Sequence, residues 1–316
     1  LTFDAAKGGD YVAQVTPDAK HLSVRLRYSF IALPEEGYQA RAYHPLSGYL
    51  SDEYLDYGTR VDEDIRQRFL LRHRLEKVTP GSAPSQVVKP ITYYLDPGVP
   101  EPIRTALLEG ASWWEDAFTH AGFINGFKVE LLPEDADPQD VRYNMIQWVH
   151  RATRGWSYGS AVTDPRTGEI IKGHVTLGSQ RVRQDHLIAR GLTAGWEDRA
   201  AAGDAAMALA LARIRQLSAH EVGHTLGLDH NFAASSNSNA SVMDYPHPMV
   251  AINGDKIDIS KPYDEGIGAW DKYTVAYGYG EFADGSEAQG LSKLRDDVAK
   301  QGLRYIGEAD SRTAGA

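Results

Sequence analysis

The chain has 316 residues, a formal net charge of −10 at pH 7 and a hydrophobic content of 42%, which suits one large globular domain or two modest ones. The acidic balance argues against a nucleic-acid-binding surface, which needs a basic face, and no run reaches the ~18 consecutive apolar residues of a membrane span. The absence of cysteine excludes disulfides, a thiolate nucleophile and cysteine zinc ligands.

Residues 1–87 mix short β-type runs with turns, so we expect a β-rich N-terminal segment. Residues 21–33 alternate polar and apolar side chains, which predicts one or two strands. Residues 61–77 alternate charged and apolar side chains and are compatible with either a strand or a helix. Residues 80–85 are rich in proline, glycine and serine, which break regular structure, and are the best linker candidate.

From residue 88 onward the pattern is easier to interpret. Strands come first, around one early helix, and a long helix follows, so we expect an α+β fold. The predicted elements are strands at 91–95, 127–132 and 145–149, a helix at 100–120, a hairpin of 158–162 with 170–177, and a long helix at 205–226.

The long helix ends in the segment His-Glu-Val-Gly-His-Thr-Leu-Gly-Leu-Asp-His, residues 220–230. Because His220 and His224 are four residues apart, both imidazoles project from one helix face and can meet one zinc ion at ~2.0–2.1 Å. Glu221 is displaced around the helix and is suited to act as general base on water at the open metal position, where zinc lowers the pKa of water toward ~7.

A third ligand is supplied by the residues after the helix. Gly227 tolerates a positive φ and lets the chain turn sharply, so His230 can return to the metal. The short pattern alone arises by chance on polar helix faces, but the extended pattern with Gly227 and His230 is a specific signature of zinc peptidases.

These residues, together with the following Ser241-Val-Met-Asp-Tyr-Pro246, resemble the metzincin clan of zinc metalloproteases. More narrowly, the chain is similar to bacterial zinc-dependent metalloproteinases with a catalytic domain like the A subunit of the Ecx toxin. The resemblance implies a five-stranded twisted mixed sheet over an active-site helix, with a smaller irregular C-terminal subdomain. The catalytic domain would cover residues 88–316, with an upper part at 88–230 and a lower part at 231–316.

The resemblance also implies roles for residues outside the zinc motif. Met243 would be the Met-turn methionine that packs beneath the three histidines. Tyr245 would stabilise the oxyanion or, with Pro246, form a wall of the pocket for the substrate side chain beyond the cleaved bond. A peptide would bind along the edge strand at 158–162, with Tyr158, Ser160 and Ala161 as substrate-binding residues. Each of these residues also has a purely structural interpretation. The strand at 158–162 would be part of an ordinary hairpin, Tyr245 would be a packed ring, and Met243 would be an ordinary core methionine.

Other features leave alternatives open. Residues 1–87 are interpreted as a structural support, a propeptide-like remnant or a part of the cleft. Four acidic residues near the lower part lack the alternating oxygen ligands of a calcium loop, so a calcium ion is not supported; they are Asp255, Asp258, Asp264 and Glu265.

The function that we predict is a zinc-dependent endopeptidase that cleaves internal peptide bonds of a polypeptide substrate through a glutamate-activated, zinc-bound water. The alternative is a non-catalytic, zinc-containing binding or toxin-type subunit. The chain begins at Leu1 without a charged n-region and apolar h-region, so we interpret it as a mature or trimmed product whose targeting segment, if any, is gone. With the resemblance to bacterial metalloproteinases, we expect a bacterial, secreted or periplasmic protein. A monomer is favoured.

Overall fold

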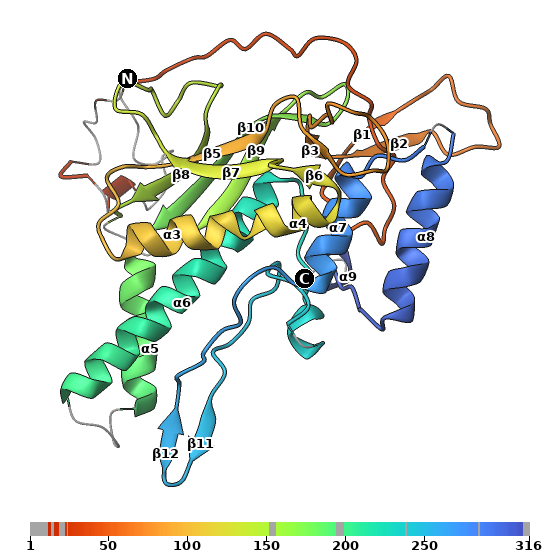
Figure 1. The fold of residues 1–316 in the computed structure, drawn as a ribbon. Coiled ribbons are helices and arrows are strands. Elements are labelled where there is room, and N and C mark those ends of the chain that lie inside the picture. The colour runs from red at the N-terminus through yellow and green to blue at the C-terminus, as the bar shows by residue number, and fades with distance from the viewer. Residues whose placement is uncertain are drawn as a thin grey trace.

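The computed structural model describes residues 12–13, 16–18, 23, 25–151, 156–193, 199–237, 239–283 and 285–311. Its largest sheet is mixed and has six strands in the order β3-β10-β8-β5-β7, with β9 also paired to β10 (Figure 1). The strands of this sheet are β3 (Arg72–His73), β5 (Ile91–Leu95), β7 (Phe127–Leu131), β8 (Asn144–Val149), β9 (Tyr158–Thr163) and β10 (Glu169–Gly178).

This sheet is parallel except at β9, which pairs antiparallel with β10. Strand β5 follows the expected alternation, because Ile91, Tyr93 and Leu95 are buried and the residues between them are less so. The sheet differs from the expected five-stranded one: five strands come from residues 91–178, and the N-terminal segment adds the two-residue strand β3. The fold is mixed α/β.

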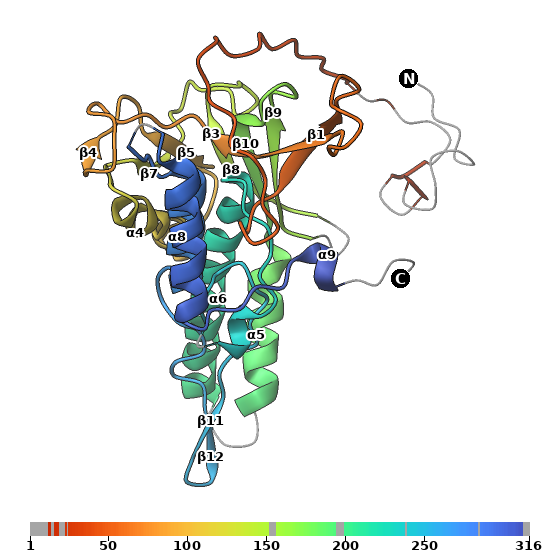
Figure 2. The same cartoon turned by 90° about the vertical axis from the view of Figure 1, so that its right-hand side faces the viewer.

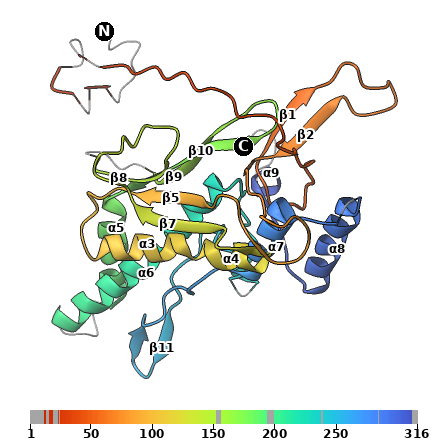
Figure 3. The ribbon, with the colours of Figure 1, turned by 45° about the horizontal axis from the view of Figure 1, so that its top comes forward.

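Helices α3 (Ile103–Ser112), α4 (Trp114–His120) and α6 (Arg199–Thr225) lie on one face of this sheet (Figures 1 and 3). The single helix expected at 100–120 is instead two helices. They are separated at Trp113, whose N–H bonds to the Gly110 carbonyl three residues back at 3.3 Å and so tightens the turn. Helix α5 (Gln180–Thr193), which we did not predict, packs along α6.

Beyond α6, the chain forms a less regular lower part in which a small hairpin projects away from the sheet (Figure 2). Helices α7 and α8 lie beside each other, and the short α9 follows them. The elements of this part are η1 (Ala234–Ser236), β11 (Ala251–Asn253), β12 (Lys256–Asp258), α7 (Ala269–Tyr279), α8 (Glu287–Lys300) and α9 (Glu308–Ser311).

The N-terminal segment has two parts of different character. Residues 21, 22 and 24 of the expected strand lie outside the described residues, and residues 25–33 are exposed and form no strand, so that prediction is wrong. No strand among the described residues pairs with them, so their alternating pattern joins no described sheet. The later part contains the β1 (Ser51–Leu55) and β2 (Arg66–Leu70) hairpin, which resolves the ambiguity over residues 61–77 in favour of strands.

Residues 80–85 are not a free linker. The Lys77 ammonium donates to the carbonyls of Gly81 and Ala83 at 2.8 and 2.9 Å, and the Gly81 N–H donates to Glu281 at 2.8 Å. Strand β4 (Ser85–Gln86) then pairs with β6 (Phe123–Ile124). This stretch is therefore held against the rest of the fold.

The N-terminal segment also supports the end of the long helix. The Leu50 N–H donates to the Gly227 carbonyl at 2.8 Å, and the Asp229 N–H donates to the Gly48 carbonyl at 2.9 Å. The Arg41 guanidinium is buried and donates to the carbonyls of Tyr277 and Gly278 at 2.6 and 2.8 Å.

Among the described helices, none is both long enough and apolar enough to cross a membrane.

Candidate metal centre

Helix α6 and the turn after it place three histidines at one point. His220 and His224 lie on the same face of α6, which ends at Thr225. Gly227 then adopts φ +98°, and a Cβ there would lie 1.8 Å from the Leu71 carbonyl oxygen. Only glycine fits this turn. The turn returns His230 to the other two histidines, as the spacing predicts.

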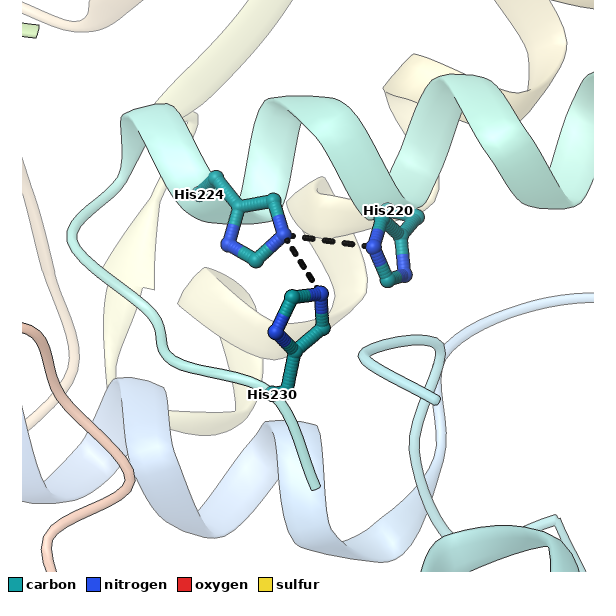
Figure 4. A group of neighbouring side chains, drawn as sticks. All are labelled: His220, His224 and His230. Atoms are coloured by element: carbon teal, nitrogen blue, oxygen red, sulfur yellow. Dashed lines mark hydrogen bonds between the residues drawn. The ribbon is translucent and has the colours of Figure 1, made fainter. Parts of the chain in front are cut away.

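The Nε2 atom of His224 lies 3.2 Å from the Nε2 atoms of both His220 and His230 (Figure 4). Two nitrogen ligands of a tetrahedral zinc ion are separated by about 3.3 Å, so the cluster has the dimensions of a three-histidine zinc site. Among the described residues, these three histidines form a group whose potential metal-ligand atoms all lie within 4.8 Å of one another.

The other ring nitrogen of each histidine already has a partner. An Nδ1–H that donates to an oxygen leaves the Nε2 lone pair free, and it fixes the orientation of the ring. With each Nδ1 atom as the donor, adjacent Nε2 lone pairs do not hydrogen-bond to each other, and their close approach is compatible with a shared cation. The acceptors are the Val242 carbonyl for His220 (2.8 Å), the Leu228 carbonyl for His224 (2.9 Å) and a Glu308 carboxylate oxygen for His230 (2.9 Å).

Burial keeps these imidazoles neutral, which metal ligation requires. Desolvation lowers the pKa of His220 well below its usual value and the pKa of His224 to about 4. It also lowers the pKa of His230, although the Glu308 charge opposes this.

Glu221 is 4% exposed, and burial raises the pKa of its carboxyl to about 7. The Arg213 charge and a hydrogen bond from the Gly159 backbone oppose that shift. A carboxyl with this pKa exchanges a proton readily near neutral pH, as a general acid–base group must.

Met243 packs tightly against the histidine helix. It is 1% exposed, and a Cβ on Gly223 would lie 2.3 Å from the Met243 sulfur and 2.7 Å from the Trp114 ring. The absence of a side chain at Gly223 therefore lets the methionine approach α6 between the first two histidines. This placement is what a floor beneath the cluster needs.

The segment that carries Met243 is held by a buried carboxylate on α7. Asp271 accepts hydrogen bonds from the Ser241 hydroxyl at 2.5 Å and from the N–H groups of Val242 and Gly268, each at 2.9 Å. Burial raises the pKa of Asp271 to about 6, and these bonds oppose the shift. The Val242 carbonyl also accepts a hydrogen bond from Nδ1 of His220. Asp271 therefore holds the N–H of Val242 and His220 holds its carbonyl.

Tyr245 lies over two of the histidines. Its ring centroid is 4.9 Å from that of His220 and 4.8 Å from that of His230. Tyr245 and Pro246 also line a cavity of about 450 Å³ beside Glu221. The placement suits both roles expected for Tyr245, at the reacting centre and in a pocket wall.

Strand β9 is an edge strand, because within the described residues it pairs only with β10. It carries Tyr158, Ser160 and Ala161, and it packs so closely on α6 that a Cβ on Gly159 would lie 2.3 Å from the Glu221 carbonyl oxygen. The three expected substrate-binding residues therefore lie on an accessible edge beside Glu221.

The fold brings to this region three polar residues that were not predicted from the sequence, namely Glu308, Asp271 and Arg213. Glu308 and Asp271 are far from the zinc motif along the chain. Arg213 was within reach of sequence reasoning, because it lies seven residues before His220 and hence on nearly the same helix face.

Comparison with known families supports this picture for the second part of the chain. Residues 202–316 match the family model described as Met-zincin, and residues 1–78 match the model of a domain of unknown function (DUF5117). No curated protein matches the chain. The match supports a metzincin-type domain at residues 202–316 and suggests zinc metallopeptidase activity for it.

Proposed function

We propose that this chain is a zinc-dependent endopeptidase in which the three clustered histidines hold the ion and Glu221 is the general base. The observation that carries the proposal is the convergence of three Nε2 atoms whose Nδ1 atoms are already engaged, beside a buried glutamate. A zinc ion held by three protein ligands polarises a carbonyl and acidifies water at its open position.

Glu221 takes a proton from the attacking water and passes it to the leaving amine, and its raised pKa suits both transfers. Tyr245, whose ring packs at a tilt against those of His220 and His230, stabilises the oxyanion. Met243 forms the floor of the site, and the Met-turn assignment belongs to this proposal.

The accessible edge of β9 supports a polypeptide substrate. A peptide added to this edge gains backbone hydrogen bonds that do not depend on its sequence. Ser160 and Ala161 lie in the middle of the strand, and Tyr158 lies at its start, 49% exposed. Pro246 contributes the cavity wall.

The non-catalytic alternative is a binding or toxin-type subunit with a structural zinc ion. Structural zinc sites are closed by four protein ligands, whereas three histidines leave a position open. The adjacent glutamate supports catalysis. We further propose that the protein is related to bacterial metalloproteinases with an Ecx-toxin-like catalytic domain and that it is secreted or periplasmic.

The test is Glu221→Gln in the purified protein. The variant should retain one zinc ion per chain and lose activity on casein by about 10²- to 10⁴-fold, which is the usual contribution of a general base. Full residual activity with bound zinc would rule out the assigned role of Glu221.

A second variant addresses the ligands. His230→Ala should weaken zinc binding strongly, as measured by competition with a chromogenic chelator. Unchanged zinc affinity would contradict the three-histidine site. Zinc binding by the parent without cleavage of any protein or peptide would favour the binding-subunit alternative.

A further inference from the structure

The cavity beside Glu221 has a strongly basic lining. Its walls come from α5, α6 and the residues that follow Met243, and it has a volume of about 450 Å³. Three arginines line it, and Glu221 at its metal-facing end is the one carboxylate among its lining residues. We call this cavity the arginine pocket; its arginines are Arg151, Arg181 and Arg213.

Arg213 is the unusual member of this group, because its guanidinium is buried without a carboxylate partner. The residue is 4% exposed. Within the described part of the chain, its contacts are a hydrogen bond from Nη1 to the Gln216 amide oxygen and the Tyr263 ring, whose centroid lies 5.9 Å away. No described carboxylate lies within ion-pair distance.

The nearby acids, Asp185 and Glu221, act on this group only from beyond ion-pair distance. Asp185, on α5, pairs with Arg181 at 3.1 Å. Glu221 belongs to the metal centre. Desolvation and the charge of Arg181 lower the pKa of Arg213 more than Tyr263, Asp185 and Glu221 raise it, so the folded protein keeps this cation at a cost. Burying a charge without a partner is unfavourable, and proteins normally compensate it with an opposite charge.

The compensating group can come from outside the chain. Guanidinium and carboxylate form charge-assisted, often bidentate hydrogen bonds, which are stronger in a desolvated pocket than at a surface. The arginine pocket also has apolar walls at Leu217 and Pro246 that suit the methylene stem of a glutamate. Its position beside Glu221 places an occupant next to the reacting bond.

We propose that the arginine pocket binds the carboxylate side chain of a substrate residue adjacent to the cleaved bond, with Arg213 as the specificity-determining residue. The proposal rests on the endopeptidase function above and names its substrate class: polypeptides with glutamate or aspartate beside the cleavage site. A carboxylate could also come from the C-terminus of a short peptide, and the experiment separates these two sources.

The experiment uses peptides acetylated at the N-terminus and amidated at the C-terminus, with Glu, Gln or Leu at each position flanking the bond that is cut. We expect the zinc-loaded protein to cleave one Glu peptide about 10- to 100-fold faster in kcat/KM than its Gln counterpart, because a buried polar group left unpaired discriminates strongly. Equal cleavage of Glu and Gln peptides would overturn this inference and leave the endopeptidase function intact. If no peptide or protein is cut, the endopeptidase function fails instead.

A second arm repeats the series with free C-termini. If the preference appears only when a free C-terminal carboxylate lies near the bond, the side-chain assignment is overturned. Binding of the same peptides to the Glu221→Gln protein, measured by fluorescence anisotropy, gives a readout independent of turnover. The Glu peptide should bind more tightly than the Gln peptide.

Substitutions of single arginines identify which of them recognises the substrate carboxylate. Arg213→Gln should abolish the preference for Glu over Gln, and Arg213→Lys should restore part of it. Arg183→Gln is the matched control, since Arg183 is exposed on α5 and does not line the pocket. A preference that persists in folded Arg213→Gln would overturn the role of Arg213. If that variant does not fold, Arg151→Gln at the less buried end of the pocket should reduce the preference, and no reduction would count against the proposal.

Discussion

The histidine cluster and the arginine pocket share helix α6, which carries His220, His224 and Arg213, yet they are built in opposite ways. In the cluster, each Nδ1 atom has an oxygen partner within the chain. In the pocket, Arg213 is equally buried but has no carboxylate partner among the described residues.

This difference shows how one helix can serve two purposes. Internal hydrogen bonds orient the histidines before any ligand arrives, which favours tight metal binding. Because the guanidinium has no carboxylate partner, a substrate carboxylate that pairs with it contributes favourable binding free energy. Variants of the cluster should therefore change zinc affinity, and variants of the pocket should change peptide preference.

The largest effect on the cluster is expected from Gly223→Val. The new side chain would overlap the Met243 sulfur and the Trp114 ring, and such overpacking costs about 1–3 kcal/mol or more. We expect a lower unfolding temperature and loss of zinc, measured by calorimetry and metal analysis. Gly191→Ala is the control, because nothing lies within 4 Å of a Cβ there. If Gly223→Val bound zinc normally, the tight approach of Met243 would not be required.

Asp271→Asn should have the next largest effect. The amide keeps one acceptor oxygen in place of two, so one of the bonds from Ser241, Val242 and Gly268 is lost or weakened. We expect destabilisation by about 1–3 kcal/mol in chemical denaturation, as for a buried group left unpaired. Zinc should also bind less tightly because the Val242 carbonyl supports His220. Unchanged stability would show that the segment 241–243 is held by packing alone.

Glu308→Gln tests the partner of the third ligand. Loss of a carboxylate that orients a ligating histidine typically reduces metal affinity by about 10- to 100-fold. We expect a reduction near the lower limit, measured by chelator competition, because the Glu308 side chain is 37% exposed. Asp310→Asn removes the same charge from the same helix and should have little effect. A changed Glu-to-Gln peptide preference in Glu308→Gln would break the separation between cluster and pocket.

The smallest effect concerns pH and the metal-free protein. Burial raises the pKa of Glu221 from 4.5 to about 7, so between these values the folded state holds a proton that the unfolded state has released. The contribution of Glu221 to the stability of the metal-free protein should therefore fall as pH rises from about 4.5 to about 7, against the opposite contribution of the buried histidines, whose pKa values are lowered. Glu221→Gln lacks this term, so its advantage in unfolding temperature over the parent should be larger at pH 8 than at pH 4.5. An advantage that does not depend on pH would contradict the raised pKa.

Local patterns in the sequence were enough to find the helix that carries the metal ligands. The helical period places His220 and His224 on one face, and Gly227 marks the turn that returns His230. Alternation correctly placed the strand at 91–95. It failed at 25–33, which pair with no strand in the described part of the chain, and it did not reveal α5 or the break at Trp113.

What the sequence by itself determined is thus the grouping of the three histidines, because their spacing within one helix and its turn depends on local geometry. Only the tertiary structure decided which distant groups complete it. Glu308 reaches His230, and Asp271 holds the segment with Met243, through packing of elements far apart in the chain. The charge of the arginine pocket arises in the same way, since Arg181 and Arg213 meet only when α5 packs along α6. No local period encodes such contacts, since they depend on how the helices pack around the sheet.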